Sequence, residues 1–171
     1  NKVRNIDVEQ IARNVEELFK SACRAYPPEV IPALEKAAES EELERAESFL
    51  RLAVENAGIA EKTGLALCHD TGMAVVFAQI GQNVHITGGL FEDAVNEGVR
   101  RAYASLRKSV LSPLERINTL DNTPAVIHIS LIEGERIILE AAPKGFGSEN
   151  MSALKMLKPC LLYTSPSPRD R

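Results

Sequence analysis

The chain has 171 residues, of which 44% are hydrophobic, and a formal net charge of −4. This length and apolar content suffice for one domain with an ordinary core, and the acidic balance argues against a basic nucleic-acid-binding surface. No apolar run approaches the roughly 20 residues of a membrane span, and residues 1–4 lead into an amphipathic segment rather than a signal-peptide core. We therefore expect a cytoplasmic protein. The three cysteines lack paired spacing, which favours reduced thiols or metal ligation over a disulfide framework.

Three helices are expected in the first third of the chain. Asp7 can cap the first helix, with Gln10 able to reach back to the cap, and apolar residues follow at helical spacing. Pro28 follows the end of that helix and can open a second one. A third helix is expected over residues 41–56, ending at Gly58.

Beyond residue 64 the pattern changes to short runs rich in β-branched residues, which is typical of strands. The expected strands cover residues 65–67, 73–80, 83–86, 125–132 and 136–142. The last two are predicted to form a hairpin through residues 133–135. A helix is expected over 90–108, with Arg107 and Lys108 in its last turn. These elements predict a mixed α/β fold of the α+β class, with N-terminal helices packed on a small mixed or antiparallel sheet.

The stretch Cys68-His69-Asp70-Thr71-Gly72 places a thiol, an imidazole and a carboxylate at three consecutive positions. A strand or turn can hold such side chains at a fixed, accessible place, as a metal ligand and an acid/base group require. The residues alone also fit a buried cysteine followed by an Asp-Thr-Gly turn. His85 and His128 fall within expected strands and are interpreted as partly solvated strand residues, and Cys23 as a structural thiol.

A glycine-rich turn, Lys144-Gly145-Phe146-Gly147, leads into residues 151–157, which are expected to form a helix. A turn that opens a helix directs backbone N–H groups at an anion, and Ser148 can cap that helix, so the turn can seat a phosphate or a carboxylate. Lys144 either contacts such an anion or is solvated. The glycine spacing matches neither a dinucleotide-binding fingerprint nor a P-loop.

Four motifs occur together and in order: Cys68–Phe77, Leu106–Ser109, Asp121–Ala125 and Lys144–Ser152. With this combination the chain resembles the class I, iron-sulfur fumarate hydratase family. It is more closely similar to the two-subunit branch, which includes the α subunit of L(+)-tartrate dehydratase. The resemblance covers residues 5–159 and implies that residues 1–159 are the N-terminal part of a catalytic, α-type domain. Residues 160–171, rich in Ser and Pro, resemble an unrelated translated tail and are predicted to be non-native.

The resemblance implies a hydro-lyase that adds water to, or removes it from, a small dicarboxylate, converting fumarate to malate or tartrate to oxaloacetate. It implies a [4Fe-4S] cluster on three cysteine thiolates, whose open iron acts as a Lewis acid on the C–OH bond. Cys68 matches the first of these ligands, whereas neither Cys23 nor Cys160 matches the other two, which are expected beyond Pro159. A β subunit or C-terminal domain is the implied partner, in a dimer or heterotetramer.

The resemblance also implies roles for single residues. Asp70 matches the motif aspartate at the substrate and is the candidate acid/base group. Arg107 matches an arginine that clamps a substrate carboxylate, and Gly147 matches the substrate-contacting glycine turn. Lys144 is a further candidate anion contact. His69 stands where the family usually has Gln, so its contact and the choice of dicarboxylate stay open.

Two other interpretations remain open. In the first, Cys68 is a nucleophile with His69 as its base, although neighbouring residues in a strand point to opposite faces. In the second, the 171 residues by themselves are a cluster-less, non-catalytic interaction domain, because two cluster ligands and the partner are not among them. We expect the second for these residues alone, which should be inactive, and the hydro-lyase for the parent protein.

Overall fold

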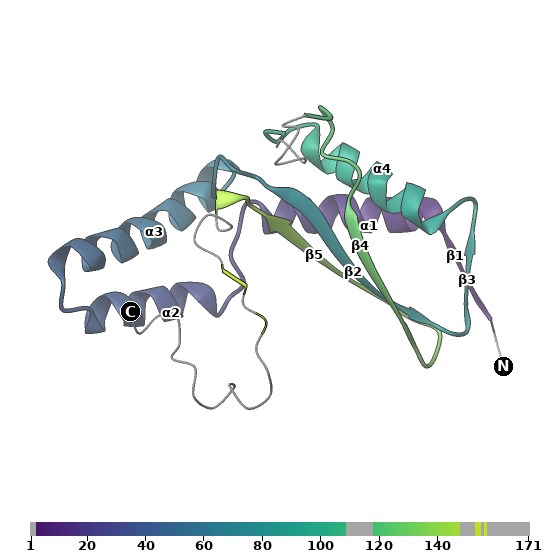
Figure 1. Ribbon diagram of the computed structural model, residues 1–171, viewed down its shortest axis with the longest axis horizontal. Helices are drawn as coiled ribbons and strands as arrows, with labels where there is room; N and C mark the ends of the chain where they lie inside the picture. Colours follow the sequence, from purple (N-terminus) through teal and green to yellow (C-terminus); the bar gives the residue numbers. More distant parts are fainter. Residues whose placement is uncertain (1–2, 109–117, 148–152, 155, 157–171) are drawn as a thin grey trace.

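The computed structural model describes residues 3–108, 118–147, 153–154 and 156. Its helices and small sheets form the predicted α+β fold (Figure 1). Within these residues, no helix combines the length and the apolar character that crossing a bilayer requires. The elements in chain order are β1 (Arg4–Asp7), α1 (Val8–Ala22), α2 (Val30–Ser40), α3 (Glu44–Thr63), β2 (Met73–Gly81), β3 (Val84–Thr87), α4 (Phe91–Tyr103), β4 (Val126–Ile132) and β5 (Ile137–Lys144).

The central strand of the larger sheet is β2, and the strand order is β4-β2-β5. β4 runs parallel to β2, with Ile127 opposite Val76, and β5 runs antiparallel, with Ala141 opposite Val76. β1 and β3 form a separate parallel pair, in which Ile6 lies opposite Ile86. Because β2 is paired on both sides along most of its length, the sheet fixes the start of β2, directly after the Cys68–Gly72 motif.

The hairpin predicted from residues 125–132 and 136–142 is wrong in its pairing. Both strands form, but β2 lies between them, and the turn over 133–136 passes the end of β2 instead of joining paired neighbours. The backbone N–H groups of Gly81 and Asn83 donate to carbonyl groups in that turn at 2.8 and 2.9 Å. Alternation of apolar residues predicts which face of a strand is buried, but it carries no information about which strand lies beside it.

The core lies between α1, α4 and one face of the larger sheet. Along β2 the side chains of Ala74, Val76 and Ala78 are buried, whereas the intervening Phe77 is 44% exposed. This alternation follows from the period of two residues in a strand. The largest fully buried side chains of the core are Ile11, Val15, Phe19, Val76, Val95, Val99 and Tyr103.

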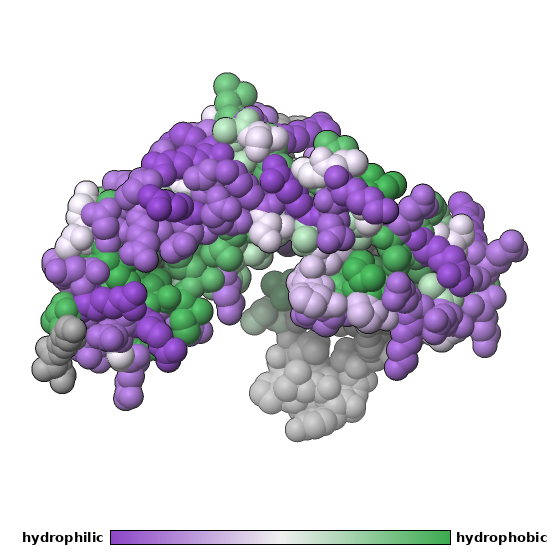
Figure 2. Space-filling model, turned by 180° about the vertical axis from the view of Figure 1, so that it is seen from behind, coloured by the Kyte–Doolittle hydropathy of each residue, from purple (hydrophilic) through white to green (hydrophobic). Residues whose placement is uncertain are grey.

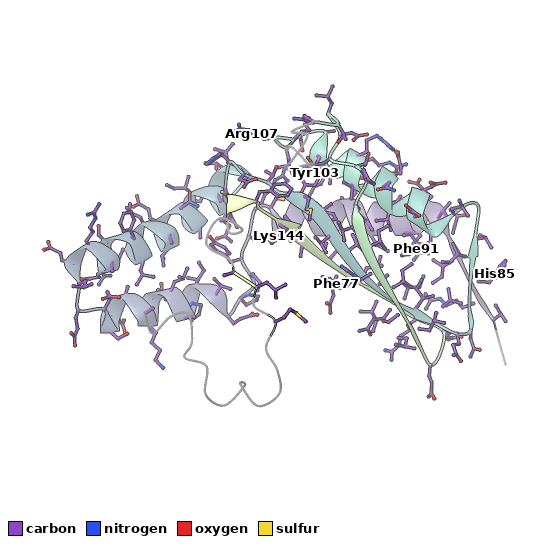
Figure 3. The ribbon with its side chains drawn as sticks, in the orientation of Figure 1. Phe77, His85, Phe91, Tyr103, Arg107 and Lys144 are labelled. Atoms are coloured by element: carbon purple, nitrogen blue, oxygen red, sulfur yellow. The ribbon has the colours of Figure 1, made fainter. Side chains whose placement is uncertain are left out.

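The opposite face of the sheet is open in the part of the chain that the structure describes. There the rings of Phe77 and His128 stack with their centroids 4.9 Å apart. His128 is exposed, and so is His85 on β3, at the end of the molecule remote from Arg107 and Lys144 (Figure 3). The interpretation of both histidines as partly solvated strand residues is confirmed.

The first helix begins as the sequence predicts, at Asp7. The Asp7 side chain accepts a hydrogen bond from the backbone N–H of Glu9 at 2.8 Å, so the partner is Glu9 and the expected return contact from Gln10 is not part of the described cap. At the other end, the N–H of Cys23 donates to the carbonyl of Phe19. Cys23 itself is buried, as expected of a structural thiol.

Two expected helix ends and one expected strand are wrong. α3 continues past Gly58 to Thr63 and ends at Gly64, whose φ of 71° is the left-handed conformation of a helix cap. α4 ends at Tyr103, so Arg107 lies beyond the helix rather than in its last turn. Residues 65–67 form no strand: their backbone bonds to the carbonyl of Cys23 and to the side chains of Asn56 and Thr63 instead of to a neighbouring strand.

α2 and α3 form a helical arm that extends away from the sheet (Figure 1). They pack on each other, and each has one buried residue, Ala38 on α2 and Ala60 on α3. Phe49 and Leu52 on α3 are 62% and 55% exposed, and Figure 2 shows hydrophobic residues on the surface of this arm. The arm therefore contributes little to the core.

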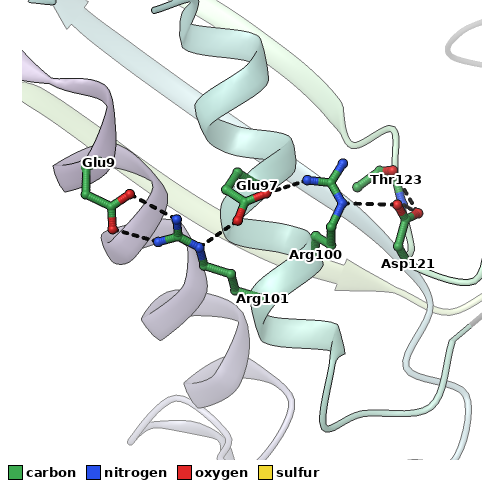
Figure 4. Close-up of polar contacts among 6 residues, drawn as sticks. All are labelled: Glu9, Glu97, Arg100, Arg101, Asp121 and Thr123. Atoms are coloured by element: carbon green, nitrogen blue, oxygen red, sulfur yellow. Dashed lines mark hydrogen bonds and ion pairs between the residues drawn. The ribbon is translucent and has the colours of Figure 1, made fainter. Parts of the chain in front are cut away.

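A chain of ion pairs links α1, α4 and the loop before β4 (Figure 4). Arg101 binds both carboxylate oxygens of Glu9 at 2.7 and 3.0 Å and also binds Glu97 at 2.8 Å. Hydrogen bonds from Arg101 lower the pKa of both carboxyl groups. Arg100 continues the chain to Asp121 at 3.3 Å. These pairs are partly solvated, so they orient the loop more than they stabilise the fold.

The close approach of α1 and α4 predicts opposite effects for two glycine substitutions. At Gly98 on α4 a Cβ would lie 2.5 Å from the carbonyl oxygen of Ala12 and 2.7 Å from Cβ of Val15. We expect Gly98→Ala to lower the free energy of unfolding by about 1–3 kcal/mol. At Gly58 on α3 a Cβ would meet no atom within 4 Å, so Gly58→Ala should raise it by up to about 1 kcal/mol.

Urea denaturation of the 171-residue chain, followed by far-UV circular dichroism, measures both effects. Equal changes for the two variants would contradict the packing described for α1 and α4.

Candidate functional site

The Cys68–Gly72 motif lies between the end of α3 and the start of β2. The residue before it is anchored from two directions: the N–H of Leu67 donates to the carbonyl of Cys23 at 2.8 Å, and Asn56 Nδ2 donates to the Leu67 carbonyl at 2.8 Å. The motif therefore begins at a point that both α1 and α3 hold.

The back of the motif is held by buried polar contacts. Tyr103 Oη, at the end of α4, donates to the carbonyl of Thr71 at 3.0 Å, and Asn122 Nδ2 donates to the carbonyl of Gly72 at 2.6 Å. Thr71 Oγ1 in turn donates to the carbonyl of Arg107. Thr71 and Asn122 are buried polar residues, so these bonds replace contacts that water would otherwise make.

Tyr103 is a donor in this cluster because it stays neutral. Burial raises the pKa of its hydroxyl well above the usual range, and the neighbouring Cys23 raises it further. Burial also raises the pKa of the Cys23 thiol, although a hydrogen bond with Tyr103 opposes that shift. Both groups are therefore protonated at neutral pH, and the Tyr103 hydroxyl keeps its proton for the carbonyl of Thr71.

Asp70 joins the motif to the glycine turn, 76 residues further along the chain. Its Oδ1 accepts a hydrogen bond from the N–H of Gly72 at 3.2 Å, and its Oδ2 accepts one from the N–H of Phe146 at 3.1 Å. The turn passes so close that a Cβ at Gly145 would lie 3.1 Å from Oδ2. Two backbone N–H groups from separate segments thus set the orientation of the carboxylate.

Gly72 makes the closest approach in the site. Its φ is 69°, and a Cβ there would lie 2.2 Å from the backbone carbon of Lys144. Met73 is paired with Lys144 in the β2–β5 ladder, so the sheet brings the motif and the turn together. Lys144 Nζ donates to the carbonyl of Gly145 at 3.0 Å. Lys144 is half-buried, which differs from a freely solvated lysine.

The candidate site residues differ in exposure and in how firmly the structure holds them. Asp70 is half-buried and held at the turn, whereas Cys68, His69, Arg107 and Gly147 are exposed. The backbone of Arg107 contacts Thr71, and Figure 3 places Arg107, Tyr103 and Lys144 at the same end of the sheet.

Cys68 and His69 are adjacent, but no hydrogen bond joins the thiol to the imidazole among the residues that the structure describes. The same residues contain no group of three or more His, Cys, Asp and Glu side chains placed to hold a metal ion. Cys68 by itself fits as one exposed thiolate ligand, so a cluster would need further thiolates from elsewhere. Residues 148–152, Cys160 and the 160–171 tail lie outside the described residues.

A family model described as fumarate hydratase (Fumerase) matches residues 12–165. The chain belongs to the fumarate hydratase family. The resemblance to class I fumarate hydratases inferred from the four motifs is thereby confirmed.

Two curated proteins resemble this fumarate hydratase family member in sequence. One is a protein of Methanocaldococcus jannaschii, provisionally named L(+)-tartrate dehydratase subunit alpha, which is 40% identical over 158 residues, covering 88% of this chain and 55% of that protein. The other is fumarate hydratase 2 of Leishmania major, which is 34% identical over 106 residues, covering 59% of this chain and 18% of that protein. The chain thus spans about half the length of the first relative and less of the second.

Sequence reasoning missed two residues that hold the site, Tyr103 and Asn122. Tyr103 lies at an apolar position of its helix, and no sequence signal separates a core tyrosine from one whose hydroxyl acts as a donor. Asn122 lies inside the Asp121–Ala125 motif, but no role was predicted for it. Its backbone φ of 65° and its buried amide are visible only in three dimensions.

The buried Gly72 and the exposed Gly147 should respond differently to substitution by alanine. Gly72→Ala places a Cβ against the backbone of Lys144 in the left-handed conformation, and we expect it to cost about 2–5 kcal/mol of unfolding free energy, the sum of clash and strain. Gly147→Ala meets no atom within 4 Å and should change stability by less than about 0.5 kcal/mol. Thermal denaturation of both variants, with circular dichroism, checks this difference.

A Gly72→Ala variant as stable as Gly147→Ala would contradict the contact between the motif and β5.

Proposed function

We propose that this chain is the N-terminal part of the catalytic, α-type component of an iron-sulfur hydro-lyase that interconverts a hydroxylated dicarboxylate and its dehydrated form. The candidate reactions are fumarate to malate and tartrate to oxaloacetate. The observation that carries the proposal is the Asp70 carboxylate, which two backbone N–H groups orient and which follows the exposed Cys68 by two residues. Membership in the fumarate hydratase family and the two named relatives support it.

Asp70 is the proposed acid/base group. Each of its oxygens accepts one backbone hydrogen bond. An ionised carboxylate offers about four acceptor positions, so such a group can accept a proton from a substrate carbon or hydroxyl. The contacts at both oxygens restrict rotation of the carboxylate, so its reactive lone pairs stay in one direction. A base held in this way is suited to removing the proton next to the departing hydroxyl group.

Cys68 is the proposed ligand to one iron of a [4Fe-4S] cluster. It is exposed and lies two residues before Asp70, so a ligand thiol and the proposed base belong to the same short segment. When bound, such a cluster supplies a Lewis-acidic iron that activates the hydroxyl group to be lost. The other two thiolates are proposed to come from sequence corresponding to the remainder of the longer relatives.

The exposed Arg107 guanidinium is proposed to bind a substrate carboxylate through two parallel N–H···O bonds. Gly147, on the turn that binds Asp70, is proposed to bring its backbone against the substrate, with Lys144 as a nearby positive charge. His69 is proposed as the donor to a second carboxylate. A diacid would then be held at both ends with its reacting carbon above Asp70.

The name of the archaeal relative includes the words subunit alpha. We propose that this chain likewise works with a second component, a β subunit or a C-terminal domain. The assignment of residues 1–159 to the catalytic domain, the non-native origin of residues 160–171 and a cytoplasmic location stay predictions.

The cluster is tested by anaerobic reconstitution of the complete gene product and its partner with iron and sulfide. We expect visible absorbance from a bound cluster, and its loss in Cys68→Ser, because a serine hydroxyl is a poor substitute for a thiolate. Cys23→Ser is the matched control: Cys23 is buried against Tyr103, so this variant should retain the absorbance.

Equal iron content in wild type and Cys68→Ser would contradict ligation by Cys68. A Cys68 thiol that is rapidly alkylated in a protein without iron uptake would favour the nucleophile interpretation instead.

The reaction is tested by assaying the same complete enzyme against malate, fumarate and tartrate. Asp70→Asn should lower kcat by about 10²–10⁴ because it removes the acid/base group while preserving its size. Arg107→Lys should chiefly raise KM, since lysine cannot form the bidentate contact. Glu140→Gln, on the exposed face of β5, is the matched charge control and should leave both constants unchanged. Full activity of Asp70→Asn would exclude the assigned role.

A further inference from the structure

Asn122 is fully buried and lies directly behind the motif. Its side-chain Nδ2 donates to the carbonyl of Gly72 at 2.6 Å, from a residue 50 positions further along the chain. Its own φ of 65° is one that asparagine tolerates better than most residues. A buried amide in an uncommon backbone conformation is retained only where the surrounding structure determines it.

The loop that carries Asn122 is itself fixed to α4. The carboxylate of Asp121 accepts hydrogen bonds from the N–H and Oγ1 of Thr123 at 3.0 and 2.8 Å, and from Arg100 at 3.3 Å. Despite partial desolvation, these bonds lower the pKa of Asp121. On the far side, the N–H of Ala125 donates to Asn96 Oδ1 at 2.8 Å. These hydrogen bonds fix the loop to α4 and so hold the Asn122 amide in place.

Both backbone polar groups of Gly72 are committed to named partners. Its N–H donates to Asp70 Oδ1 at 3.2 Å, and its carbonyl accepts the Asn122 amide. The orientation of Gly72 thus determines where one of the two donors to the Asp70 carboxylate points. Through this glycine the Asn122 amide is connected to the Asp70 carboxylate, which makes Asn122 a candidate for an indirect role.

We infer that Asn122 is a positioning residue: by holding the Gly72 carbonyl, its amide keeps the Gly72 N–H directed at Asp70 and so orients the carboxylate. The consequence for catalysis rests on the proposed function, whereas the local ordering of the motif does not. A purely structural residue would instead stabilise the fold without a particular effect on residues 70–74.

Two variants separate the effect of the Asn122 side-chain amide from the effect of its backbone conformation. Asn122→Gly removes the amide and accepts a positive φ without strain, and Asn122→Asp keeps the size of the side chain but removes the donating NH₂ group. Val99→Ala is the matched control, because Val99 is a fully buried core residue of α4 and its truncation destabilises the core without removing a side-chain hydrogen bond to Gly72.

The first measurement is amide hydrogen exchange of the 171-residue chain, analysed by peptide mass spectrometry under conditions in which all variants are folded. Both Asn122 variants should speed exchange in the peptide that spans residues 70–74 about tenfold, with the peptides of α1 and of β2 beyond residue 74 changed no more than in Val99→Ala. Exchange that rises uniformly, or not at all near Gly72, overturns the inference.

The second measurement is steady-state kinetics of the complete enzyme. The Asn122 variants should lower kcat about tenfold with a smaller change in KM, because a tilted base impairs the chemical step more than binding. Faster local exchange combined with unchanged kcat overturns the catalytic part. If wild type has no hydro-lyase activity, the proposed function fails, while hydrogen exchange still decides whether Asn122 orders the motif.

Discussion

The site depends on the close approach of Gly72 to the backbone of Lys144. A side chain at Gly72 would stand 2.2 Å from the Lys144 carbonyl carbon, so the two segments can pass each other only because one of them is glycine. The β2–β5 ladder enforces this approach by pairing Met73 with Lys144. The same contact brings the glycine turn to Asp70, so the sheet and the candidate site share one junction.

Around this junction, the molecule separates a buried back from an exposed front. At the back, Tyr103 and Asn122 supply donors to the two consecutive carbonyl groups of Thr71 and Gly72. Leaving such buried groups without partners would cost about 1–3 kcal/mol each, so the α1–α4 core and the motif support each other. At the front, Cys68 and Arg107 are exposed and can meet groups from outside the described residues.

A motif with a buried, hydrogen-bonded back and an exposed front suits a site to which several parts of a protein contribute residues. The chain spans about half the length of its archaeal relative, and the described residues hold one outward-facing thiol rather than a full set of metal ligands. What these residues do supply is a rigidly oriented carboxylate and a backbone turn. The α2–α3 arm, with exposed Phe49 and Leu52, adds an apolar surface of its own.

Local pattern was sufficient for α1, with its Asp7 cap, for the core of β2 and for the α+β class, because these follow from residue periodicity and side-chain hydrogen bonds within a few positions. The four motifs also sufficed to identify the family. Local pattern failed at the ends of α3 and α4. α3 continues past Gly58, since a glycine permits helix termination without requiring it, and α4 ends at Tyr103 although apolar residues at helical spacing continue to Leu106. Only the tertiary structure placed β2 between β4 and β5, and only it brought Asp70 to Phe146 and Asn122 to Gly72. Those contacts join residues 76 and 50 positions apart, and their geometry depends on strand pairing, which side-chain period does not encode.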